Sequence, residues 1–128
     1  MQMTAIDEKV QHAIIATHTG YFQTGGMTQD LIWEQYPYPT RLSTLLRGNA
    51  PDMAFAPQRV TTVTPAESPP QDVWLNKTGA TNGFSAYVAF VPKERMGIVI
   101  LANKSYPIAA RVKLAYRIVS ELAPKAAQ

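Results

Sequence analysis

The tripeptide Lys77-Thr78-Gly79 combines three groups that suit the recognition of a small anionic ligand. Lysine supplies a positive charge, and threonine supplies a hydroxyl that can donate a hydrogen bond. Glycine has no side chain, so a ligand can approach the backbone closely at that position. An apolar run, Val73-Trp74-Leu75, lies just before the tripeptide and is typical of a strand. The sequence therefore predicts an anion-binding surface on the edge of a sheet.

The segments around this tripeptide predict a sheet with a helix at each end of the chain. Apolar residues spaced as one helical face predict a helix over residues 6–18. A Gly25-Gly26 turn predicts a β-hairpin over residues 20–36. Two apolar runs joined by Pro92-Lys93-Glu94-Arg95 complete three strands over residues 73–103. In these two runs the residues that would face one side of the strand and those that would face the other are both apolar. We therefore expect their strands to be covered on both faces.

The last predicted element is a helix over residues 105–122, with Ser105 as its N-cap. Its apolar stripe should pack on the sheet, whereas Arg111 lies off the stripe and should face water or a ligand cleft. The stripe consists of Ile108, Val112, Ala115, Val119 and Leu122.

Residues 37–72 are rich in proline, which interrupts almost every regular element that could form there. Only residues 40–47 suit a short helix. A segment of this length without regular structure is uncommon within a domain unless it is a functional loop or a linker. We therefore expect a loop that borders the ligand, with a linker as the alternative.

Composition limits the class of protein. A chain of 128 residues with 46% hydrophobic and 16% charged residues suits one small domain over residues 1–128. The net charge of +3 comes from scattered basic residues, which argues against a nucleic-acid partner. No apolar run approaches the roughly 20 residues of a membrane-spanning helix. The chain has no cysteine, and His12 and His18 lie six apart without carboxylates at ligand spacing, so we expect no metal and no cofactor.

The longer runs around the tripeptide resemble one known family. Residues 73–122 are similar to the C-terminal end of a class C serine β-lactamase, and upstream runs fit the same family in the same order, so that the resemblance extends from about residue 7 to residue 122. The matching runs are Asn76 to Phe84, Ala86 to Pro92, Gly97 to Asn103, Thr17 to Tyr21, Met27 to Gln29, and Trp33-Glu34.

The resemblance implies the mixed α/β (α+β) fold of β-lactamases and penicillin-binding proteins, with an antiparallel sheet packed by the N- and C-terminal helices. The family's nucleophile lies in Ser-x-x-Lys and its second signature is Tyr-x-Asn. Neither pattern occurs in these 128 residues. We therefore expect a single incomplete domain, a C-terminal fragment whose N-terminal half is missing and which is inactive alone. Family members are periplasmic, and the N-terminus shows no signal peptide.

The resemblance also assigns roles to residues. Lys77 and Thr78 would hold the carboxylate of a β-lactam, with Lys77 also acting electrostatically in catalysis. The backbone N–H of Ala80 would form half of an oxyanion hole, which stabilises charge in the tetrahedral intermediate. Gly79, Thr81, Ser105 and Arg111 would complete the substrate-binding surface, although a solvated helix arginine remains an alternative for Arg111.

Several positions depart from the family's usual pattern. Asp30, Ile32 and Ser85 stand where glycine is usual, so we expect these replacements to be destabilising if the glycines have special backbone angles. Ser105 and Ile108 stand where the family often has asparagines. The resemblance therefore does not extend to the asparagine side chains that would recognise the substrate near the start of the last helix.

Three functions remain open from the sequence. The first is a part of a class C β-lactamase that acts on β-lactams through an acyl-enzyme. The second is an esterase or peptidase of the same superfamily. The third is a non-catalytic fragment that associates with itself through strand edges and apolar faces.

Overall fold

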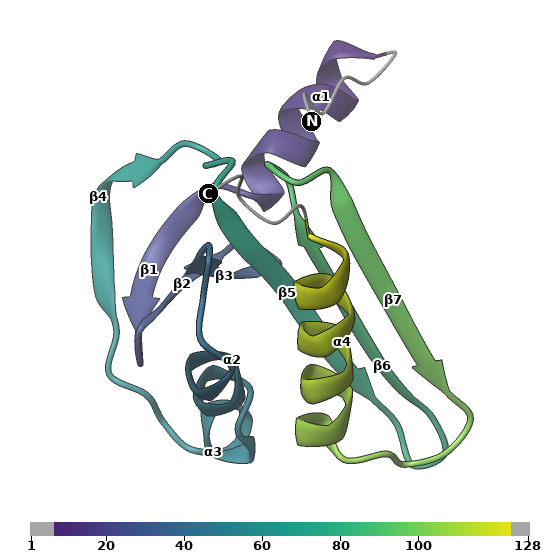
Figure 1. Cartoon of the computed structure of the whole chain (residues 1–128). Helices are drawn as coiled ribbons and strands as arrows, with labels where there is room; N and C mark the ends of the chain where they lie inside the picture. The colour runs from purple at the N-terminus through teal and green to yellow at the C-terminus, as the bar shows by residue number, and fades with distance from the viewer. Residues whose placement is uncertain (1–6, 124–128) are drawn as a thin grey trace.

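Within the described residues, 7–123, seven strands of the computed structural model form one sheet, with the second and the last helix over one face and the first helix projecting beyond one end (Figure 1). The elements in chain order are α1 (Glu8–Thr17), β1 (Gly20–Thr24), β2 (Met27–Asp30), β3 (Glu34–Pro37), α2 (Leu42–Gly48), α3 (Pro51–Phe55), β4 (Thr61–Glu67), β5 (Val73–Ala80), β6 (Ser85–Val91), β7 (Met96–Ala102) and α4 (Ile108–Leu122). The strands lie in the order β4-β1-β2-β3-β5-β6-β7, and every neighbouring pair is antiparallel. This is the predicted α+β arrangement.

The core lies between one face of the sheet and the helices α2 and α4, which are neighbours over that face (Figure 1). Side chains from β3, β5 and β6 meet side chains from both helices there. The fully buried members of this core include Tyr36, Leu45, Trp74, Tyr87 and Val112. Burial of large apolar side chains contributes about 1.5–3 kcal/mol each, so this layer holds the described part of the fold together.

The predicted apolar stripe of α4 packs as expected at its centre. Val112, Ala115 and Val119 are buried, and Ile108 is partly buried against them. Leu122 is 67% exposed, so the prediction is wrong for the last position of the stripe. Ser105 is not the N-cap, because the helix begins at Ile108 after Pro107, whose fixed φ suits a helix start.

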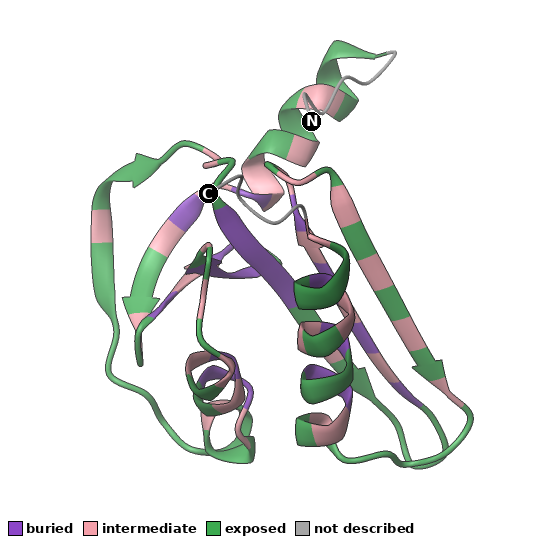
Figure 2. Ribbon diagram, in the orientation of Figure 1, coloured by how far each residue is buried: buried purple, intermediate pink, exposed green. Residues whose placement is uncertain are grey.

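Helix α1 forms where it was predicted, but it buries no residue completely (Figure 2). Residue 6, the first of the predicted helix, lies outside the described residues. Asp7 caps the helix by accepting hydrogen bonds from the backbone N–H groups of Lys9 and Val10. The end of the helix contacts the sheet, where the ring of His18 lies against those of Trp33 and Phe90.

The predicted hairpin over residues 20–36 is correct at its turn and wrong in its second strand. Gly25 and Gly26 have φ values of +55° and +87°, which side chains disfavour and glycine permits. The second segment ends at Asp30 and the chain turns again, so that β3 pairs with β2. Leu31 in this turn is 64% exposed.

The prediction of a loop over residues 37–72 is wrong. A helix near residues 40–47 was expected and α2 confirms it, but the segment also contains α3 and β4. Pro51 does not interrupt a helix, since it stands at the first turn of α3, where a missing N–H costs nothing. Pro65 lies inside β4, which is an edge strand whose register with β1 is irregular. Proline is tolerated at edges and bulges because fewer ladder hydrogen bonds are needed there.

Strand β7 is covered on one face only. Ile98 and Ile100 pack partly against the core, whereas Val99 and Leu101 are 63% and 75% exposed. The prediction of two covered faces is therefore wrong for β7, which is an edge strand of the described sheet. No helix among residues 7–123 is long and apolar enough to cross a membrane.

Asp30 is a buried carboxyl group without a partner. The residue is 3% exposed, and neither of its side-chain oxygens has a hydrogen-bond partner among the described residues. Burial, assisted by the negative charge of Glu67, raises the pKa of Asp30 from 3.8 to about 7. The neutral acid is therefore favoured in the folded chain, and ionisation opposes folding.

We expect the free energy of unfolding to fall as the pH rises from about 4 to about 7 because of Asp30. In this window the unfolded chain has already released the proton that the folded chain still holds. In Asp30→Asn this contribution is absent, so the variant gains stability relative to the parent as the pH rises. Urea unfolding between pH 4.5 and 7.5 measures the difference. The exposed Asp72→Asn is the control, and a constant difference for Asp30→Asn across the range contradicts the assignment.

We expect the exposed face of β7 to drive self-association of the 128-residue chain, because contiguous exposed apolar side chains favour contact with another surface. Leu101→Gln should shift the distribution toward monomer, as measured by light scattering over a concentration series. Leu31→Gln removes a leucine of similar exposure at the turn between β2 and β3, away from β7, and should leave association through β7 unchanged. Equal effects of the two substitutions, or a monomeric parent chain at high concentration, would count against association through β7.

Candidate functional site

Strand β5 carries the Lys77-Thr78-Gly79 tripeptide and has two neighbours of different length. Strand β3 pairs with β5 from Val73 to Asn76. Strand β6 pairs with it from Leu75 to Ala80. Within the described residues, the stretch from Lys77 to Ala80 thus has one edge without a strand beside it, which is the sheet edge that the sequence predicted.

The register of β5 and β6 sets the direction of the Ala80 N–H. The N–H of Thr81 donates to the carbonyl of Phe84 over 2.8 Å. Antiparallel pairs alternate between hydrogen-bonded and non-hydrogen-bonded positions, so the next pair, Ala80 with Ser85, is non-hydrogen-bonded. The backbone N–H and C=O of Ala80 are therefore directed away from β6, toward the unpaired edge.

Lys77 is anchored by a carboxylate that the sequence analysis did not single out. Its Nζ lies 2.5 Å from Oε1 of Glu34, and the two side chains are 45% and 11% exposed. The ammonium is therefore held at the strand edge while much of it stays accessible to a ligand. Trp33-Glu34 matched the family pattern, but 43 residues of separation hid the pairing from any local analysis.

The carboxylate of Glu34 belongs to a buried polar network. Its Oε2 accepts a hydrogen bond of 2.9 Å from Nδ2 of Asn76, which is fully buried. Asn76 and Asn49 exchange side-chain hydrogen bonds of 3.3 and 3.4 Å. Asn49 also donates to the Leu45 carbonyl at the end of α2 over 2.9 Å. The position of the ammonium is thus coupled to the packing of α2 on the sheet.

Arg111 is buried, which contradicts the alternative of a solvated arginine, and it lies at the edge of the groove described below. It is 2% exposed, and burial lowers the pKa of its guanidinium. Its Nη1 donates to the Gly79 carbonyl over 3.1 Å and to the Ala86 carbonyl. Since Gly79 and Ala86 are register partners, Arg111 ties α4 to both strands at the motif. Its Nε has no partner among the described residues.

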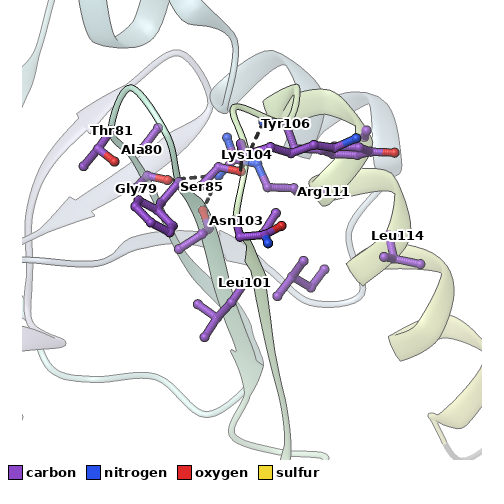
Figure 3. Close-up of a pocket in the computed structure, with 15 residues that line it drawn as sticks. Gly79, Ala80, Thr81, Ser85, Leu101, Asn103, Lys104, Tyr106, Arg111 and Leu114 are labelled. Atoms are coloured by element: carbon purple, nitrogen blue, oxygen red, sulfur yellow. Dashed lines mark hydrogen bonds between the residues drawn. The ribbon is translucent and has the colours of Figure 1, made fainter.

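An open groove of about 910 Å³ lies beside the end of the motif, and Figure 3 shows the residues around it. The groove is lined by the end of β5, by the end of β7 and by the first turns of α4. It includes Gly79, Ala80, Thr81 and Arg111, while Lys77 and Thr78 lie outside its lining. A side chain added at Gly79 would meet nothing within 4 Å, so this position is open to a ligand or another segment.

The remaining predicted residues are spread around this groove. Thr78 is half-buried in β5, and Thr81 is exposed where β5 ends. Ser105 is exposed in the connection to α4, between Lys104 and Tyr106, which line the groove. The structure thus brings Gly79, Ala80 and Thr81 to one surface, with Ser105 at its margin.

The replacement of glycine by Ser85 is accommodated rather than strained. Its hydroxyl donates to the Lys104 carbonyl over 3.0 Å and accepts from the Tyr106 N–H over 3.2 Å (Figure 3). Ile32 is half-exposed at the turn between β2 and β3. Of the three departures, only Asp30 is therefore a buried group that lacks hydrogen bonds.

We expect Glu34→Leu to destabilise the chain by about 1–3 kcal/mol, because the buried amide of Asn76 loses its acceptor and Lys77 loses its counterion. Urea unfolding gives the change in free energy. Glu34→Gln keeps a side-chain acceptor and should cost less. Glu121→Leu breaks an ion pair between two exposed side chains and should change stability little. A Glu34→Leu variant as stable as Glu121→Leu would contradict the role of the network.

The chain matches known proteins along nearly its whole length. The model of the Beta-lactamase family matches residues 5–123. A β-lactamase of Pseudomonas fluorescens is 50% identical over 122 residues, which are 95% of this chain and 34% of that protein. A β-lactamase of Providencia stuartii is 43% identical and is covered to 32%. The chain thus spans about a third of the length of these relatives.

Solved structures agree with the sequence comparison. A class C β-lactamase in complex with cefoxitin is 57% identical, with a TM-score of 0.85 over 89% of this chain and 32% of that one. A D-alanine carboxypeptidase from Burkholderia cenocepacia is 56% identical, with a TM-score of 0.89 over 94% and 34%. From the family match, the fold and these identities, we conclude that the chain belongs to the β-lactamase family, within its class C branch.

Proposed function

We propose that this chain supplies one wall of a serine β-lactamase active site. In this proposal Lys77 and Thr78 hold the carboxylate of the β-lactam, and the Ala80 N–H is one of two donors of the oxyanion hole. The observation that carries the proposal is the unpaired stretch of β5, where an accessible ammonium and an outward N–H stand on one edge. Thr81 and the open backbone at Gly79 would border the bound substrate.

The nucleophile and its base belong, in this proposal, to residues outside these 128. A serine there attacks the lactam carbonyl, the amide C–N bond breaks, and water later hydrolyses the acyl-enzyme. The Ala80 N–H stabilises the oxyanion of the tetrahedral intermediate together with the N–H of that serine. Loss of one such donor typically costs about 10²–10³ in rate, so the chain's contribution to catalysis is substantial. The periplasm, where the family is exported, is the proposed location.

Arg111 has a different role in this proposal from the one that the sequence suggested. Because its Nη1 already serves the carbonyls of Gly79 and Ala86, it acts as a positioning residue for the strand that presents the Ala80 N–H. The carboxylate of the substrate is left mainly to Lys77 and Thr78. Arg111 therefore acts on the oxyanion donor through the backbone.

A second candidate is D-alanine carboxypeptidase activity, because the similar protein from Burkholderia cenocepacia, at 56% identity, is a D-alanine carboxypeptidase. Both reactions pass through a serine acyl-enzyme, and both substrates carry a carboxylate that Lys77 could bind. The two functions differ in the leaving group and in the rate of deacylation. Parallel assays with nitrocefin and a D-alanyl-D-alanine peptide on the same protein separate them.

We expect activity in a chimera whose N-terminal two thirds come from the Pseudomonas fluorescens relative and whose matching third is this chain. The chimera should hydrolyse nitrocefin. Lys77→Ala should lower kcat/KM about 10- to 100-fold, as for the loss of a hydrogen bond to a charged group. Ala80→Gly should matter far less, because the donor is backbone. Steady-state kinetics measure both.

The controls separate the site from general effects. Lys113→Ala removes an exposed lysine of α4 and should leave kcat/KM unchanged. The 128-residue chain alone, incubated with a penicillin, should show no covalent serine adduct by mass spectrometry, since it lacks Ser-x-x-Lys. Equal losses from Lys77→Ala and Ala80→Gly would refute the assigned roles. A folded chimera without activity would refute the proposed function.

A further inference from the structure

A second cavity, of about 260 Å³, lies away from the motif, beside the end of α1. Three ring systems line it, from the residue after α1, the turn before β3 and the strand β6. The rings of His18 and Trp33 are stacked with centroids 5.7 Å apart, and Phe90 meets both edge-on at 5.4 and 5.0 Å. Prolines of the segment before β5 cover the other side. The cavity therefore offers flat apolar walls suited to a planar molecule.

His18 contributes a hydrogen-bond acceptor to this cavity. Its Nδ1 lies 2.8 Å from the Ile14 carbonyl, which can only accept, so Nδ1 carries the proton. In the neutral imidazole the other nitrogen, Nε2, is then an acceptor. Nε2 is buried and has no partner among the described residues. The whole residue is 7% exposed, so bulk water does not satisfy it.

Gln35 contributes a second acceptor. It also lines the cavity, is 3% exposed, and its Oε1 is buried without a partner in the described part of the chain. Buried polar atoms normally have hydrogen-bond partners, because leaving one unsatisfied costs about as much as its desolvation. Two acceptors in one aromatic cavity thus lack a donor among the described residues.

We propose that this cavity binds a small uncharged aromatic molecule that bears an N–H or O–H group. Its ring lies among the three aromatic side chains and its donor reaches Gln35 Oε1 or His18 Nε2. The volume exceeds that of an apolar cavity of about 150 Å³ that holds benzene, and it is below the usual range for drug-sized ligands. A single substituted ring therefore fits. A charged ligand is disfavoured, because none of the described residues that line the cavity is a carboxylate, lysine or arginine that could pair with it.

Aniline and toluene test this proposal as a matched pair, since they differ only by an amino group in place of a methyl group. The two tryptophans of the chain serve as reporters in proton–nitrogen NMR spectra. Trp33 lines the cavity, whereas Trp74 is buried in the core on the other face of β5 from the cavity-lining Leu75. Aniline should shift the Trp33 indole signal saturably, leave Trp74 unchanged, and bind about fivefold more tightly than toluene, as one net hydrogen bond predicts.

Gln35→Met removes the acceptor with little change of shape. It should reduce aniline binding to the level of toluene without weakening toluene. Gln23→Met, at an exposed position of β1, is the matched control and should leave the ratio unchanged. If Gln35→Met does not fold, the ratio of the two affinities in the unchanged chain decides alone.

Three results would overturn the proposal. Equal affinities for aniline and toluene would remove the role of the acceptors. Equal shifts of both tryptophan signals would show non-specific contact. No shift with either probe up to its solubility would mean that the cavity holds only water. None of these readouts needs the nucleophile, so they are independent of the proposed β-lactamase activity.

Discussion

The candidate site depends on the unequal pairing of β5. Its first half is held between β3 and β6, and its second half is held by β6 alone. A strand with two neighbours has its backbone groups satisfied and can bind nothing more along its edges. Strand β3 begins at Glu34, opposite Asn76. The backbone groups on this edge of β5 therefore lose their strand partner one residue before Lys77. The same register places the carboxylate that anchors Lys77 at the end of the neighbouring strand.

Two sets of side-chain hydrogen bonds hold the half-paired strand β5 in place. On one side the network from Glu34 through Asn76 and Asn49 connects the strand to α2. On the other side the guanidinium of Arg111 connects its end to α4. Both sets bury polar groups, which is costly unless they are paired. The described residues pair most of them, and Nε of Arg111, which has no partner among them, belongs to a residue that lines the open groove.

The parts of the fold that the sequence predicted are those with a local periodic signal. The stripe of α4, the two-glycine turn and the hairpin of β6 and β7 all depend on spacings shorter than about ten residues. The missed elements depend on context. Pro51 begins a helix and Pro65 sits in an edge strand, and nothing in the local sequence distinguishes these prolines from those of a loop.

The candidate site, too, was predictable in its local part and not in its long-range contacts. The motif and its strand were predictable from Lys77, Thr78 and Gly79, but the partners of these residues come from distant segments. Glu34 lies 43 residues from Lys77, and Arg111 lies 32 residues from Gly79. The register of β3 on β5 brings Glu34 to Lys77, and the packing of α4 on the sheet brings Arg111 to Gly79. The helical stripe placed Arg111 off the apolar face, yet its long side chain reaches back under the strands, which spacing alone does not describe.

Helix α1 contributes little packing energy to the rest of the described chain. None of its ten residues is buried, and its last turn is held by hydrogen bonds of Thr17, His18 and Thr19 to carbonyls of the same helix. The sheet therefore gains little from the first two turns of α1, which gain equally little from the sheet. The end of α1 next to His18 is thus the part of the helix that packs against the sheet. Because α1 leads into β1 within three residues, the backbone and the ring contacts of His18 with Trp33 and Phe90 both connect this helix to the sheet.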